Sequence, residues 1–358
     1  MPRNRATWLA GPKVHPFLID DAPFPEAGPG EVVIRAVFTA LNPAEWKIQD
    51  LGIIVTKYPN ILGADAAGFV EQVGQGVTHV KPGQRVIAYN PFLSLTQTSH
   101  SLLDRYCTGL GRQDPAFGTF QLYSKADANL TSLVPEKMTL EEAAVLPLTI
   151  STASVGLFKK KYLGLPLPKA DLETGKEKGT LLVWGGSSSV GGTAVQLASA
   201  AGLRVVATAS RGNFERVREL GAEGVVDYHD GDVVQQILHA LEGDVVGVYD
   251  AVSTEASLKP IGEVLERIGE RKVVTVLPDE NKFGRNAVLE FAAAFEITED
   301  TAEVGDPIWR EFVPKALESG RLLARPEPIV VGTGLEVIQG GLDRLKEGVS
   351  ARKLVVRY

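Results

Sequence analysis

The chain has 358 residues, 44% of them hydrophobic and 23% charged, which is typical of a soluble globular protein with two domains of ordinary size. A formal net charge of −7 argues against a nucleic-acid partner, because such a partner needs a basic surface. No apolar run approaches the roughly 20 residues of a membrane-spanning helix, and no apolar signal region follows Met1. Cys107 is the single cysteine, so no internal disulfide can form, and we expect a cytoplasmic protein.

Short strands separated by turns are predicted over residues 5–126. Segment 31–38 alternates apolar and polar residues after the turn Gly28-Pro29-Gly30, which indicates a half-buried strand. Segments 68–74 and 81–89 show similar strand and turn signals. The density of glycine and proline here favours a β-rich domain.

Two helices are predicted after this β-rich part. Thr139 and Glu142 have the spacing of a capping box, in which each residue satisfies the other's backbone N–H group. This pattern predicts a short helix that ends at Pro147. A second helix is expected to begin near Ser151 and to run toward Tyr162.

From residue 180 onward, apolar strands alternate with amphipathic helices, which predicts an α/β fold with a doubly wound parallel sheet. The expected strands are 181–184, 204–209, 224–227, 245–251 and 272–277, and the expected helices are 190–201, 213–220, 232–241 and 257–268. Segment 353–358 is a further strand that we expect to return to the first domain. The predicted boundaries are 1–153 with 321–358 for the β-rich domain and 154–320 for the nucleotide-binding domain.

The Gly/Ser turn 185–191 lies between the strand 181–184 and the helix 190–201, which is the arrangement of a dinucleotide-phosphate site. Small residues let the backbone approach a pyrophosphate, and N–H groups at a helix start attract its negative charge. We expect the N–H groups from Ser188 to Val190 to hold the pyrophosphate. The cofactor residues predicted here are Ser187, Ser188, Ser189 and Val190. The alternative is an ordinary helix start with serine caps.

The end of the second nucleotide-domain strand predicts the choice of cofactor. Enzymes of this fold that use NAD place a carboxylate there for the ribose 2′-hydroxyl, but this chain has Ser210, Arg211 and Asn213. A permanently charged guanidinium suits the 2′-phosphate of NADPH. We therefore expect NADPH. The alternative is a helix cap at Ser210 or Asn213 beside a solvated arginine.

Several segments, taken in chain order, resemble the medium-chain dehydrogenase/reductase superfamily. They are Asn42-Pro43, 62–74 (LGADAAGFVEQVG), 80–86 (VKPGQRV), 118–123 (GTFQLY), 142–147 (EAAVLP), the Gly/Ser turn and 351–356 (ARKLVV). The segments 42–47, 150–153, 163–168 and 184–189 resemble its zinc-free fungal branch, which includes trans-acting enoyl reductases that serve polyketide synthases. The resemblance, which extends to quinone oxidoreductases, implies a GroES-like catalytic domain beside a Rossmann domain that binds NADPH.

The zinc ligands of the superfamily are missing from their expected places. Zinc-dependent members place a cysteine just before the Asn42-Pro43 region and a histidine after the glycine at 63, where this chain has Leu41 and Ala64. With Cys107 alone, the four-cysteine structural zinc site cannot form. Asp65 and Glu45 are either ligands of another cation or buried, hydrogen-bonded carboxylates. We expect no metal.

The resemblance also implies cofactor contacts outside the Gly/Ser turn. Tyr228 would line the adenosine pocket, Val276 and Leu277 would flank the nicotinamide, and Ser350 and Ala351 would touch the cofactor. Asn42 would lie beside the nicotinamide ribose. For Tyr228 the alternative is a strand-end aromatic packed on the domain edge.

Lys47 and Thr152 are the candidate catalytic residues. Lys47 follows Asn42-Pro43 in a segment that in relatives faces the nicotinamide ribose and the substrate carbonyl, where an ammonium could stabilise developing enolate charge. Thr152 would lie at the cleft between the domains. The alternatives are a solvated surface lysine and a threonine that caps a helix start.

These observations predict an NADPH-dependent oxidoreductase that reduces an activated C=C bond of an enoyl thioester or enone, or a quinone, without zinc. The alternatives are a zinc-free carbonyl or alcohol oxidoreductase and a non-catalytic NADPH-binding protein. The substrate is a small molecule or an acyl thioester, and a synthase partner is implied by the resemblance alone. Loops 53–60 and 92–117 would shape the substrate pocket. Whether the protein is a monomer or a homodimer stays open.

Overall fold

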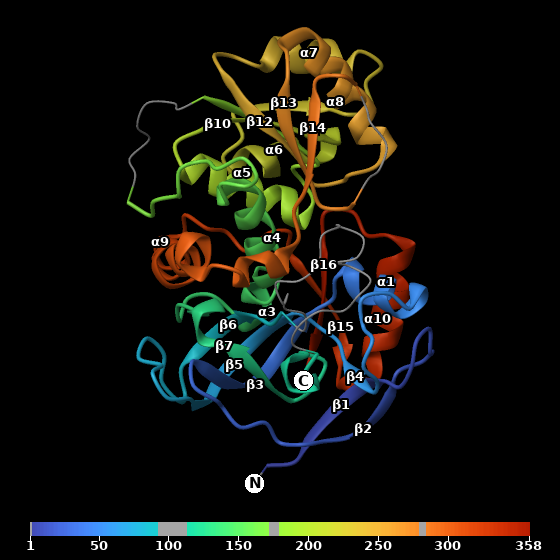
Figure 1. The fold of residues 1–358 in the computed structure, drawn as a ribbon, viewed down its shortest axis with the longest axis vertical. Helices are drawn as coiled ribbons and strands as arrows, with labels where there is room; N and C mark the ends of the chain where they lie inside the picture. Colours follow the sequence, from blue (N-terminus) through green and yellow to red (C-terminus); the bar gives the residue numbers. More distant parts are fainter. Residues whose placement is uncertain (1, 92–112, 172–178, 279–283) are drawn as a thin grey trace.

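The computed structural model describes residues 2–91, 113–171, 179–278 and 284–358. Two large sheets lie toward opposite ends of the long axis, and helix α4 (Pro147–Phe158) lies between them (Figure 1). Eleven of the twelve residues of α4 are buried. One cluster of buried apolar side chains runs through this helix from the lower sheet to the upper one, so a shared core holds the two halves together.

The upper sheet has six strands in the order β11-β10-β9-β12-β13-β14, and all its pairings are parallel. Its strands are β9 (Thr180–Trp184), β10 (Arg204–Ala209), β11 (Gly224–Asp227), β12 (Val245–Asp250), β13 (Arg271–Thr275) and β14 (Ala287–Phe291). Its helices include α5 (Ser189–Ala200), α6 (Phe214–Glu219), α7 (Val233–Ala240) and α8 (Glu255–Ile268). This is the predicted doubly wound fold, with the strand order of a dinucleotide-binding domain.

The lower sheet is mostly antiparallel and runs β15-β16-β3-β5-β6-β8, with β7 also paired to β3. Its strands are β3 (Glu31–Ala40), β5 (Asp65–Val73), β6 (Arg85–Tyr89), β7 (Tyr123–Asp127), β8 (Thr131–Leu133), β15 (Pro328–Thr333) and β16 (Lys353–Arg357). A small sheet beside it contains β1 (Asn4–Leu9), β2 (Leu18–Ala22) and β4 (Asn60–Ile61). The β-rich domain is therefore present as predicted.

The last strand returns to the first domain, as expected. Strand β16 pairs antiparallel with β3 and places Val355 opposite Ala40. The proposed boundaries at 153 and 320 stay predictions, and α4 runs across the first of them.

The helices before the upper sheet differ from the prediction. The capping box of Thr139 and Glu142 starts α3 (Leu140–Ala143), but Pro147 does not end it. Pro147 instead occupies the first turn of α4, where proline's missing N–H group has no helical partner to lose. The second helix therefore begins before Ser151 and ends at Phe158, short of Tyr162.

The remaining helical elements lie in both halves. They are α1 (Pro43–Leu51), η1 (Pro115–Phe117), η2 (Ala128–Leu130), η3 (Arg211–Asn213), η4 (Ala294–Thr298), η5 (Thr301–Gly305), η6 (Pro307–Phe312), α9 (Val313–Ser319), η7 (Leu335–Val337) and α10 (Ile338–Glu347). In the described part of the chain, none of the helices has the length and apolar character needed to cross a membrane.

Candidate functional site

The Gly/Ser turn leads from β9 into α5 as a tight, internally bonded loop. Ser188 is the N-cap of α5, and its hydroxyl accepts a hydrogen bond from the Gly191 N–H group at 3.0 Å. The Ser188 N–H group donates to the Gly185 carbonyl at 2.9 Å. Within the described residues, the N–H groups of Ser189 and Val190 have no hydrogen-bond partner. The N–H group of Ser188 is therefore already used within the turn, whereas those of Ser189 and Val190 remain available, and the contact of this segment with a pyrophosphate stays a prediction.

Glycine is needed in this turn for close backbone packing. A Cβ atom on Gly191 would lie 2.1 Å from the Gly185 carbonyl oxygen, and Gly185 itself has a φ of +81°. The serines 187–189 and Val190 are half-buried at the start of a 12-residue helix. Small residues, unpaired N–H groups and a helix N-terminus fit a dinucleotide phosphate.

The end of β10 brings three predicted cofactor residues together. The Asn213 side-chain amide donates to the Ser210 hydroxyl at 2.9 Å, and Arg216 Nη1 donates to Asn213 Oδ1 at 3.3 Å. The same Nη1 donates to the Ala351 carbonyl at 3.2 Å. Neither Ser210 nor Asn213 makes a side-chain cap contact. The neighbouring Ser350 is exposed.

Arg211, the predicted phosphate-binding cation, pairs with carboxylates. Its Nε lies 3.3 Å from Asp227 Oδ2, and its Nη2 lies 3.1 Å from Asp230. These carboxylates raise the Arg211 pKa further, Asp230 more than Asp227. The Arg211 side chain is 74% exposed. It is therefore a solvated arginine whose charge is already matched by one carboxylate at the end of β11 and one just after that strand.

Tyr228 extends this end of the site. The residue is 42% exposed, and its ring lies with its centre 4.1 Å from that of His229, tilted by 34°, while His229 contacts Asp227. An exposed aromatic ring therefore lies just beyond β11, at the position predicted for the adenosine.

The loops that follow β12 and β13 are tied to each other. The Val276 N–H group donates to the Ser253 hydroxyl at 2.8 Å, and the buried Asp250 carboxylate accepts from the Val252 and Ser253 N–H groups. A Cβ atom on Gly185 would lie 2.7 Å from Val252 Cγ2. Val276 and its half-buried neighbour Leu277 are thus connected, through segment 251–253, to the Gly/Ser turn.

Lys47 lies on α1, in the lower half. Its side chain is half-buried, and its ammonium lies 5.6 Å from the centre of the Trp46 ring. Burial lowers the Lys47 pKa. Within the described residues, no hydrogen bond or ion pair holds this ammonium, so it differs from a fully solvated surface lysine and can donate to a ligand.

A buried polar network lies beneath the start of α1. Asn42 donates from its side-chain amide to Asp65 Oδ2 at 2.9 Å and from its backbone to Glu45 Oε2 at 2.6 Å. Lys353 of β16 donates to Asn42 Oδ1, and its Nζ lies 3.7 Å from Asp65 Oδ2. The Leu148 N–H group donates to Asp65 Oδ1 at 2.6 Å. Asn42 therefore has a structural position here.

The two buried carboxylates of this network are not equivalent. Burial raises the Glu45 pKa to about 8, against the opposing effect of Asn42. Burial also raises the Asp65 pKa, but Lys353 and its hydrogen-bond donors oppose that shift and stabilise the carboxylate. Of the two alternatives considered for these residues, the geometry matches hydrogen-bonded carboxylates. Among the described residues, no group of three or more possible ligands could hold a metal ion.

Thr152 lies in the second turn of α4, so it is not a cap at the helix start. Its hydroxyl donates to the Leu148 carbonyl at 2.7 Å, and the Tyr249 hydroxyl donates to the Thr152 carbonyl. The N–H group of the same Leu148 donates to Asp65. One hydrogen-bonded chain thus runs from the helix of Lys47, through Asn42 and Asp65, to the turn that holds Thr152.

Sequence reasoning did not single out Lys353 or Arg216. Lys353 lies 311 positions from Asn42 and reaches it only through the β16–β3 pairing. Arg216 is one of several charged residues on a short helix, and nothing in the sequence spacing distinguishes it. Residues His100, Asp104 and Cys107, and most of the predicted substrate loop 92–117, lie outside the described residues.

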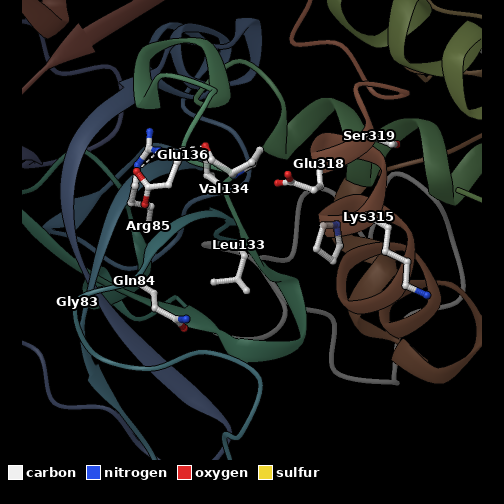
Figure 2. Close-up of a pocket in the computed structure, with 11 residues that line it drawn as sticks. Gly83, Gln84, Arg85, Leu133, Val134, Glu136, Lys315, Glu318 and Ser319 are labelled. Atoms are coloured by element: carbon white, nitrogen blue, oxygen red, sulfur yellow. Dashed lines mark hydrogen bonds and ion pairs between the residues drawn. The ribbon is translucent and has the colours of Figure 1, made fainter.

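A pocket of about 820 Å³ lies elsewhere, between β6, β8 and α9 (Figure 2). Arg85 and Glu136 lie on one side of it and Glu318 and Lys315 on the other, and none of the predicted site residues lines it. The predicted site residues lie near the ends of strands of the upper sheet and on α1 and α4, outside this pocket.

Two family models of known proteins match this chain. Residues 28–136 match the family model of the alcohol dehydrogenase GroES-like domain, and residues 189–296 match that of the zinc-binding dehydrogenases. The chain is 37% identical to the trans-enoyl reductase himH of Aspergillus japonicus, over 99% of this chain and 97% of that protein. It is 36% identical to the dehydrogenase azaJ of Aspergillus niger, over 99% of each.

Among solved structures, an alcohol dehydrogenase superfamily protein from Novosphingobium aromaticivorans has a TM-score of 0.75. The match covers 99% of each chain at 22% identity, so it bears on the fold.

Proposed function

Because this chain belongs to the medium-chain dehydrogenase/reductase family and is an oxidoreductase that uses a nicotinamide cofactor, we propose that it is an NADPH-dependent, zinc-free reductase. Its acceptor would be the activated C=C bond of an enoyl thioester or an enone, or a quinone. The relative himH bears the name trans-enoyl reductase, which favours the thioester. A synthase that carries the acyl chain would then be the partner.

The adenosine and phosphate groups of the cofactor would lie along the upper sheet. Ser189 and Val190 would donate their free N–H groups to the pyrophosphate, and Tyr228 would stack near the adenine. Ser210 and Asn213 would contact the 2′-phosphate, because no carboxylate occupies positions 210–213. Arg211 lies beside this position but is paired with Asp227 and Asp230, whereas the guanidinium group of Arg216, which contacts Asn213, adds positive charge there.

When bound, the reduced nicotinamide supplies a hydride to the acceptor. The observation that supports a metal-free acceptor site is the half-buried ammonium of Lys47, which has no hydrogen-bond or ion-pair partner among the described residues and lies on the helix above the buried carboxylate network. Lys47 would donate to a ribose hydroxyl or to the acceptor carbonyl, where it would stabilise developing enolate charge. The Asp65 oxygens already accept hydrogen bonds from Asn42 and Leu148 and lie near the Lys353 ammonium, which supports a structural rather than a zinc-binding role for this carboxylate.

Thr152 is the second proposed catalytic residue. Its hydroxyl already donates to the Leu148 carbonyl, so it retains acceptor capacity toward a ligand. Thr152 is 7% exposed and lies on the buried helix α4, which would hold its side chain in one position relative to Lys47.

The function is tested by following NADPH oxidation at 340 nm with a 2-enoyl thioester, an enone, a quinone and a simple ketone. We expect turnover with at least one of the first three and little with the ketone, and no loss of activity after dialysis against a chelator. Turnover with the ketone alone would favour a carbonyl reductase. NADPH binding without turnover of any acceptor would favour a non-catalytic binding protein.

A further inference from the structure

Two arginines lie near the end of β10, and their surroundings differ. Arg211 is flanked by the carboxylates of Asp227 and Asp230, so the local charge is negative. Arg216 shares the single carboxylate of Glu327 with Arg325 and Arg352, at 3.0, 3.5 and 2.9 Å respectively. An added dianion would be repelled at the first position and attracted at the second.

Glu327 is ionised in this cluster. Burial would raise its pKa, but a backbone hydrogen bond and the guanidinium groups of Arg216, Arg325 and Arg352 together hold it below the ordinary value. Three guanidinium groups against one carboxylate leave an excess of positive charge beside Ala351.

Arg216 also has the geometry of a preformed binding group. Its side chain is 22% exposed, whereas that of Arg211 is 74% exposed. Nη1 is fixed by Asn213 Oδ1 and the Ala351 carbonyl, and Nη2 by Glu327. A guanidinium has five N–H donors, so Nε–H and the second Nη2 hydrogen are not used by these three contacts. Asn213, which accepts from Arg216, also donates to the Ser210 hydroxyl, so a single side chain links the guanidinium group to Ser210.

We propose that Arg216, not Arg211, is the main cation for the 2′-phosphate of the cofactor and the principal determinant of NADPH specificity. This inference rests on the proposed use of NADPH. Arg216 reaches from α6 to Ala351 and Glu327, which belong to segments of the lower half. The 2′-phosphate would therefore be bound at the junction of the two halves.

The test uses ligands that lack the nicotinamide. Adenosine 2′,5′-bisphosphate and 5′-AMP are titrated by calorimetry into the wild-type protein and into Arg216→Gln, Arg211→Gln and Arg218→Gln. Removing a charged hydrogen-bond donor should raise the Kd of the bisphosphate about 10- to 100-fold in Arg216→Gln, and change that of 5′-AMP by less than about threefold. Arg218, exposed on the same helix, is the matched control.

A second variant separates binding from folding. Glu327→Gln removes the carboxylate that shares Arg216, so it should lower the Kd of the bisphosphate, an improvement that damage to the fold cannot produce. Arg216→Lys should bind the bisphosphate more tightly than Arg216→Gln does, because it keeps the positive charge.

The outcomes are distinguishable. If Arg216→Gln weakens the binding of the bisphosphate and of 5′-AMP equally, the role of Arg216 is overturned while NADPH stays the cofactor. The same holds if the preference for the bisphosphate over 5′-AMP disappears in Arg211→Gln but not in Arg216→Gln. A wild-type protein without preference for the bisphosphate would overturn the NADPH assignment itself, and the role of Arg216 with it.

Discussion

Charged side chains are buried at one end of the candidate site and exposed to solvent at the other. In the network beneath α1, Glu45 and Asp65 are completely buried, Lys353 is 5% exposed, and each of these three groups has a fixed hydrogen-bond or ion-pair partner. At the adenosine end, Arg211 and the side chain of Asp230 are 74% and 27% exposed.

This difference separates the expected roles of the two ends. Water and salt screen exposed pairs, so their loss costs little stability and changes mainly which ligand binds. A buried charge that loses its partner cannot be solvated by water, so removing the partner lowers the stability of the protein directly. The α1 end should therefore control folding and the placement of Lys47, and the adenosine end the choice of cofactor.

The largest expected effect is that of Asp65→Asn. The substitution leaves the Lys353 ammonium as an uncompensated buried charge, and we expect the free energy of unfolding to fall by about 3–5 kcal/mol. Asp50→Asn is the matched control, because Asp50 pairs with the exposed Lys346 and should cost less than about 1 kcal/mol. Denaturant unfolding of both variants provides the comparison. Equal losses would show that burial does not distinguish the two pairs.

Lys47→Met tests the ammonium beside this network. Turnover should fall about 100-fold or more, because the group that stabilises the developing negative charge is lost, while the free energy of unfolding changes by less than about 1 kcal/mol, because no hydrogen bond or ion pair of the ammonium among the described residues is removed. Lys346→Met is the control, since Lys346 also lies 5.6 Å from the Trp46 ring. Steady-state kinetics with whichever acceptor the wild-type protein turns over would measure both variants. A Lys47 variant with wild-type turnover would remove this lysine from the mechanism.

Glu45→Gln tests the buried acid. The Glu45 pKa is raised from 4.5 to about 8 in the folded protein, so the folded state keeps a proton that the unfolded state releases. The contribution of Glu45 to stability is therefore fully present below pH 4.5 and is lost as the pH rises through about 8, with a slope of at most about 1.4 kcal/mol per pH unit. Glu45→Gln should flatten this fall.

The measurement is the free energy of unfolding at pH 5 and pH 8. Glu142→Gln is the control, because Glu142 occupies the same capping position at the start of α3 but is not buried. That variant should change stability by similar amounts at both pH values. If Glu45→Gln keeps the wild-type pH dependence, Glu45 is not the buried acid responsible.

Much of the upper half was predictable from the sequence, because parallel strands are continuous apolar runs between helices. Strand β14 was missed, since only Phe291 among its five residues is fully buried. The Pro147 signal was misjudged because proline favours the first helical turn as well as the residue after a helix.

The site was predictable where it depends on local sequence. The Ser188 cap follows from residues 185–191 alone. The Asn42–Asp65–Lys353 network was not predicted, because sheet topology brings together residues that are 23 and 311 positions apart. The pairing of Arg211 with Asp227 likewise depends on β10 lying beside β11.

The most direct test of the proposed reduction follows the hydride. NADPH that carries deuterium at the reactive C4 position is incubated with the protein and a 2-enoyl thioester or enone, and the product is analysed by mass spectrometry and NMR. The proposed function predicts one deuterium at the β-carbon of a saturated product. Deuterium on a carbon derived from the carbonyl group, or no saturated product from either acceptor and no NADPH oxidation with a quinone, would contradict it.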